Sequence, residues 1–98
     1  GIFNQIVDIL PNFIIYTTGD FSSEVICYLY SLNIPIVSNK INQYLIQSLN
    51  TIYYNFNARK VIQKAIEFSD IKSKQIITER FIFLQNQITA GYNVLNYS

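Results

Sequence analysis

Apolar and polar positions follow two different spacings along the chain, and each spacing predicts a different element. The runs FIIYT at residues 13–17 and TIYYN at residues 51–55 are short and rich in β-branched and aromatic residues, which is typical of strands. Elsewhere apolar residues recur every three or four positions, which indicates amphipathic helices. Four such segments follow residues suited to cap a helix N-terminus, namely Asp20, Asn39, Asn57 and Ser73.

The resulting order of strand, helix, helix, strand, helix, helix predicts an α/β fold. We expect a small sheet of two or three strands covered by four or five helices, in which Ile34–Val37 would be the third strand. Asn33 should end the helix that precedes it. A length of 98 residues suits one domain. We therefore expect a single α/β interaction domain over residues 1–98, with a sheet too small for a large cleft.

The helical spacing also predicts which side chains face the core. In the segment 21–32 the inward residues would be Phe21, Val25, Tyr28, Leu29 and Leu32. After Asn57 they would be Ala58, Val61, Ile62 and Ala65. After Ser73 they would be Ile76, Ile77, Phe81 and Leu84.

Two rings in the last helical segment cannot both lie in the core. Phe81 and Phe83 are about 200° apart around a helix with 3.6 residues per turn. One of them should therefore be exposed in the free protein, where a partner could cover it. Large exposed rings are typical of protein interfaces.

The composition excludes several kinds of chemistry. The chain has no His and a single cysteine, Cys27, which leaves no intramolecular disulfide, cysteine metal site or imidazole-based catalysis. Three glycines form no phosphate-binding loop. We therefore expect no enzyme activity, no cofactor and no metal site. Cys27 lies beside the apolar side of its helix, which favours a buried, unreactive thiol.

The hydropathy of the chain predicts no membrane association. The longest apolar stretch, Val25–Val37, is interrupted by Ser31, Asn33 and Pro35 and is shorter than the roughly 20 residues of a membrane-spanning helix. No basic segment precedes the first apolar run, so we expect a cytoplasmic protein.

Charge and aromatic residues leave the type of partner open. All seven Lys and Arg residues lie from residue 40 onward, and the net charge is only +1. A basic face formed by Arg59, Lys60 and Lys64 could bind nucleic acid, or it could be the solvated side of an amphipathic helix. The aromatic residues could likewise belong to the core, bind a protein or stack on unpaired bases.

The order of segments resembles the small non-catalytic subunit of the KEOPS complex, which makes threonylcarbamoyl-adenosine in tRNA. The similar segments are NQIVDILPNFIIYTTGDFSSEVICYLYSL, LNTIYYNFNARKVIQKAI and IKSKQIITERFIFL. The last of these matches the pattern K-x-[RK]-x-[LI]-x-x-E with Lys72, Lys74, Ile76 and Glu79. The resemblance implies docking on the kinase-like ATPase subunit of that complex. The family chain continues for another half and ends in a tail implicated in holding the tRNA end, whereas this sequence stops at Ser98. The resemblance therefore implies a truncated form, and it does not imply direct tRNA binding.

The resemblance and the helix positions of the two rings together predict the partner-binding residues, all in the last helical segment: Lys72, Lys74, Ile76, Glu79, Arg80, Phe81 and Phe83. Two other interpretations remain open. TTGDFSSEVICYLYSLNIPIVS resembles part of the sulfurtransferase that matures formate dehydrogenase, although the cysteine pair of that family is missing. The chain could also be an unrelated small adaptor, of viral or orphan origin.

Overall fold

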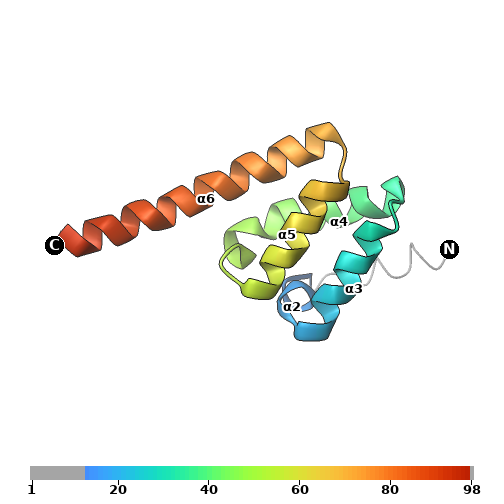
Figure 1. Cartoon of the computed structure of the whole chain (residues 1–98), viewed down its shortest axis with the longest axis horizontal. Helices are drawn as coiled ribbons and strands as arrows, with labels where there is room; N and C mark the ends of the chain where they lie inside the picture. Colours follow the sequence, from blue (N-terminus) through green and yellow to red (C-terminus); the bar gives the residue numbers. More distant parts are fainter. Residues whose placement is uncertain (1–12, 98) are drawn as a thin grey trace.

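The computed structural model describes the backbone of residues 13–97 and the side chains of residues 13–88, and this part of the chain is a bundle of helices (Figure 1). Its five helices are α2 (Phe13–Thr18), α3 (Asp20–Ser31), α4 (Pro35–Ile52), α5 (Phe56–Phe68) and α6 (Ile71–Tyr97). The described residues contain no strand. The α/β prediction is therefore wrong, and the fold is all-α.

FIIYT is helical because its buried positions fit a helix, whereas TIYYN spans the end of α4 at Ile52 and the turn that follows it. Phe13 and Thr17, four residues apart, are the buried residues of α2. Leu49 and Ile52, three apart, are buried in the last turn of α4. Strand propensity mainly reflects how a side chain packs on its neighbours, and here the neighbours are helices. The third expected strand, Ile34–Val37, instead begins α4, where Pro35 fits the first helical turn because it needs no amide donor.

The helices begin at residues other than the expected caps. Asn55, not Asn57, caps α5, because its side chain accepts a hydrogen bond of 3.0 Å from the Ala58 amide. Asp70, three residues before the expected cap Ser73, caps α6, and its Oδ1 accepts from the Ser73 amide at 2.7 Å. Asp20 is the first residue of α3 and follows the cap residue Gly19.

Asn33 ends the α3 segment as expected. It is the only described non-glycine residue with a positive φ, at 56°. Asn tolerates this left-handed conformation better than most residues, and the turn it forms leads directly into α4. Its conformation therefore positions α4 against α3.

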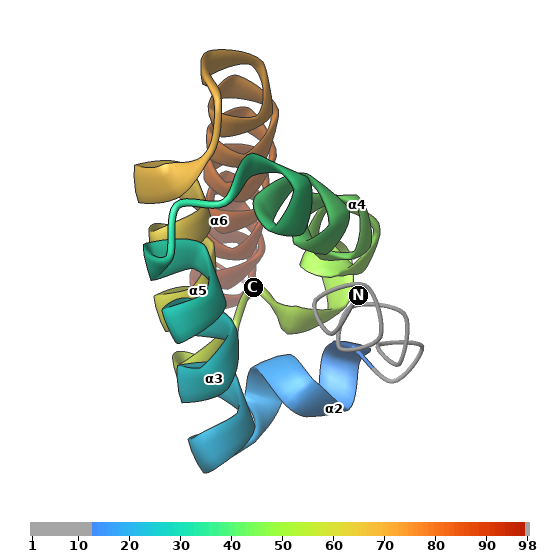
Figure 2. The same ribbon diagram turned by 90° about the vertical axis from the view of Figure 1, so that its right-hand side faces the viewer.

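Helices α3 and α5 pack side by side, and this is the most extensive helix contact in the described chain (Figure 2). Their N-terminal ends are joined by Asn57, whose Nδ2 donates to the Thr18 carbonyl at 3.1 Å and to Asp20 Oδ1 at 2.8 Å. Both Ala58 and Ala65 of α5 are fully buried. Small side chains at such positions allow two helices to approach closely.

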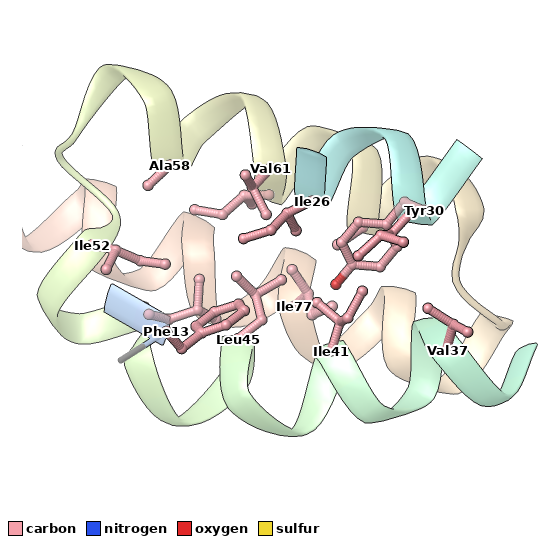
Figure 3. Packing of buried hydrophobic residues seen from close by; sticks show 14 of the residues in the cluster. Phe13, Ile26, Tyr30, Val37, Ile41, Leu45, Ile52, Ala58, Val61 and Ile77 are labelled. Carbon is pink, nitrogen blue, oxygen red and sulfur yellow. The ribbon is translucent and has the colours of Figure 1, made fainter. Parts of the chain in front are cut away.

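The core lies between these two helices and α4, with α2 at one end (Figure 3). All four residues predicted to face inward on α5 are buried, which confirms that part of the sequence prediction. Ile77 and Leu84 add the first half of α6 to the core. The rest of α6 extends beyond the bundle (Figure 1).

A short chain of hydrogen bonds crosses the apolar core. The Tyr30 hydroxyl donates to Asn42 Oδ1 at 2.6 Å, and Asn42 Nδ2 donates to Ser69 Oγ at 2.9 Å. Tyr30 and Asn42 are both buried. Burial raises the pKa of Tyr30, so its hydroxyl remains a donor over the whole ordinary pH range. The chain ties α3 and α4 to the turn between α5 and α6.

Replacing the middle member of this chain should destabilise the fold. Asn42→Ala leaves the Tyr30 hydroxyl buried without an acceptor, which should lower the free energy of unfolding by about 2 kcal/mol. Urea denaturation of Asn42→Ala, with Gln43→Ala at the exposed neighbouring position as control, measures the effect. Equal stability of the two variants would contradict the role assigned to Asn42.

Candidate partner-binding surfaces

Four residues predicted to bind a partner lie together on one side of α6. Ile76, Glu79, Arg80 and Phe83 line a shallow, open hollow of about 400 Å³; we call them the α6 surface. Their spacing of three, four and seven residues places them on one face of the helix. Ile76 is 40% exposed and Phe83 is 56% exposed. The arrangement is an apolar pair flanked by one acidic and one basic side chain.

The expectation that only one of two neighbouring rings is exposed is confirmed. Phe83 faces solvent, whereas Phe81 is half-buried and packs against the core. Of the pair, only Phe83 is therefore free to contact another molecule through most of its ring. Ile76, in contrast, was expected to face inward and is exposed, because the buried stripe of α6 runs through Ile77 and Leu84.

The remaining predicted residues of α6 lie near its start. Lys72 and Lys74 are exposed in the first turn and do not line the hollow. Hydrogen bonds from the Ser73 amide and side chain hold the pKa of the Asp70 carboxyl below its ordinary value. Asp70 therefore stays ionised and keeps capping the helix well into the acidic range.

A second apolar surface lies on α3, where the sequence predicted core. Phe21, Val25 and Tyr28 are exposed; we call them the α3 stripe. The residues that α3 does bury are Ser23, Ile26, Leu29 and Tyr30. The prediction is wrong for these three residues, because α3 has two apolar faces and Ser23 is not a typical core residue, but it is confirmed for Leu29 and in part for Leu32, which is half-buried against the core. The sequence did contain a signal of this, because the α3 segment has more apolar residues than one helix face can hold.

The basic residues of α5 each have a contact within the chain. Lys60 Nζ lies 4.7 Å from the centre of the Phe56 ring. Lys64 Nζ lies 3.8 Å from Glu67 Oε2, and Arg59 Nε donates to the Tyr53 carbonyl at 2.9 Å. These contacts are typical of the solvated side of an amphipathic helix, which was one of the two interpretations of this cluster.

Cys27 is half-buried and packs against the core cluster, so it is less enclosed than expected. Partial burial raises the pKa of its thiol, and the nearby Lys64 and Lys60 only partly offset this effect. A raised pKa lowers the thiolate fraction at neutral pH and with it the reactivity.

Comparisons with known proteins do not assign the chain to a family. A scan against family models and searches of curated proteins and of solved structures found no match. Among the described residues, no three His, Cys, Asp or Glu side chains are grouped so that they could hold a metal ion. No helix in that part of the chain has both the length and the apolar character needed to span a bilayer.

Cys27 should react more slowly in the folded protein than in the unfolded chain. Its raised pKa keeps the thiol protonated to higher pH, and its packing restricts access. Alkylation with iodoacetamide across pH 7 to about 10, with and without urea, measures this difference. We expect the rate in native protein to rise at higher pH than the rate in urea. Coincident pH profiles would contradict the assigned environment of Cys27.

Proposed function

We propose that the protein is a non-catalytic helical domain that binds another protein through the α6 surface. The observation that carries the proposal is the position of Phe83, whose ring is 56% exposed although Phe81, two residues earlier, packs on the core. An exposed ring on a helix that is anchored by its other side is pre-ordered for binding. It loses little conformational entropy when a partner covers it.

The composition of the α6 surface resembles the centre and edge of a protein interface. Interface centres are enriched in aromatic residues and Arg, and polar residues surround them. Phe83 and Ile76 supply the apolar contact, while Glu79 and Arg80 lie beside them in the same hollow. Paired charges of opposite sign favour one orientation of a complementary partner over others.

The proposal also includes the lack of a catalytic activity and the identity of the partner. The chain has no His and only one cysteine, and the chemistry of most nucleophilic sites needs such groups. The kinase-like KEOPS subunit is the partner that the sequence resemblance predicts, in the cytoplasm, with tRNA reached through the complex. Because the segments expected as strands in that resemblance are not strands in the structure, the proposal depends on α6 and not on the family.

Paired substitutions should separate binding from folding. Phe83→Ala should weaken partner binding by at least about tenfold, as removal of a central aromatic often does, and should change stability by less than about 1 kcal/mol. Phe81→Ala should lower stability by about 2 kcal/mol through the lost packing. Isothermal titration calorimetry and urea denaturation measure the two effects.

Crosslinking from the α6 surface can identify the partner for this experiment. A photoreactive phenylalanine analogue at position 83 should crosslink to one host protein, and the same analogue at exposed position 43 of α4 should not. Recovery of the kinase-like subunit would identify the partner predicted by resemblance. If Phe83→Ala binds the crosslinked protein as tightly as the unaltered chain does, α6 is not the interface.

A further inference from the structure

The α3 stripe belongs to a larger exposed face that also includes one side of α5. Helices α3 and α5 lie next to each other and run in the same direction (Figure 1). The exposed residues of both helices lie opposite their buried ones, so they share the outer side of this helix pair. We define the α3–α5 face as the α3 stripe with Glu24, together with the exposed residues of α5 at helical spacing: Phe56, Lys60, Gln63 and Glu67.

Large apolar side chains are concentrated on this face. Phe21 is 84% exposed, Phe56 is 74% exposed and Tyr28 is 63% exposed. Phe21 is the most exposed large apolar side chain in the described part of the chain. Large contiguous apolar patches are rare on soluble monomers and mark sites of interaction.

The two halves of the face carry charges of opposite sign. Both charged residues of α3, Asp20 and Glu24, are acidic, whereas three of the four charged residues of α5 are basic. Among the described residues, Glu24 has no ion pair or side-chain hydrogen bond, and the only contact of the Lys60 ammonium is with the Phe56 ring. The face is therefore complementary in charge to a second copy of itself.

A two-fold axis parallel to these helices brings the two halves together. It places α3 of each copy over α5 of the other and leaves every residue at its own height along the helices. Asn57 Nδ2 donates to Asp20 Oδ1 at 2.8 Å, so these two residues are level. Because the helices run in parallel, Glu24 is then level with the turn of α5 that contains Lys60, and Phe21 is close to the level of Phe56.

From these observations we propose that the protein forms a weak two-fold dimer through the α3–α5 face, with Phe21 of each copy against Phe56 of the other and Glu24 against Lys60. The α6 surface is not part of this face, so the dimer leaves it open for a different protein.

The area of the face agrees with a weak dimer. Aromatic side chains bury about 150–250 Å² each, so the exposed parts of three rings supply on the order of 900 Å² over the two copies. With the polar residues around the rings, the contact reaches about 1,200 Å², the lower limit of specific interfaces. We expect a Kd on the order of 100 μM. At concentrations well below this value the face is in contact with solvent.

Sedimentation velocity over a concentration series on both sides of this Kd tests the proposal. The unaltered chain should change from monomer to dimer, and Phe21→Ala should raise Kd at least about tenfold. Because this ring is exposed in the monomer, dilute Phe21→Ala should melt like the unaltered chain. Phe83→Ala, on the α6 surface, is the matched control and should dimerise normally. A monomer at every concentration, or an unchanged Kd in Phe21→Ala, would overturn the proposal.

Charge reversal tests the orientation of the two copies. Glu24→Lys and Lys60→Glu should each weaken self-association by about tenfold or more, because each homodimer then contains two contacts between like charges. Mixed in equal amounts, the two variants should form a heterodimer about as tight as the unaltered dimer, since both contacts again join opposite charges. A substitution that acts only within its own copy is not rescued by mixing. Failure of the mixture to associate would contradict the contact between Glu24 and Lys60.

Discussion

The hydrogen-bond chain from Tyr30 through Asn42 to Ser69 is the interaction on which the arrangement of the helices depends. Apolar contacts have no direction, and α3 has two faces that could supply them. A buried Tyr hydroxyl needs an acceptor, and Asn42 provides one at 2.6 Å. This requirement selects the side of α3 that carries Tyr30 as the inner one. The α3 stripe, which begins with Phe21, is left in solvent as a consequence.

The same constraint organises the far end of the molecule. Because Asn42 also donates to Ser69, the turn between α5 and α6 is fixed relative to α4. Helix α6 starts from that turn and lays Ile77 and Leu84 on the core. Its adjacent face, with Ile76 and Phe83, then points away from the bundle. The position of the proposed interface follows from where this turn is held.

Local sequence patterns predicted those parts of the fold that depend on a single segment of the chain. Helix periodicity and residue type were enough to predict the inward residues of α5, the turn at Asn33 and the exposure of one of the two rings Phe81 and Phe83. The strands failed because FIIYT fits either period and only packing on other helices settles which one forms, while TIYYN contains the end of α4 and the turn after it. The hydrogen bond from Asn42 to Ser69 could not be predicted, since these residues belong to no motif and meet only through the fold.

The central claim is that this chain has more apolar helix surface than its own core uses. Fluorine NMR of protein labelled with 4-fluorophenylalanine, with signals assigned by single Phe→Leu variants, tests it most directly. The signals of Phe21 and Phe83 should shift when the solvent changes from H₂O to D₂O, and the signal of Phe13, which is 3% exposed, should not. Signals of Phe21 and Phe83 that do not respond to the solvent would contradict the account.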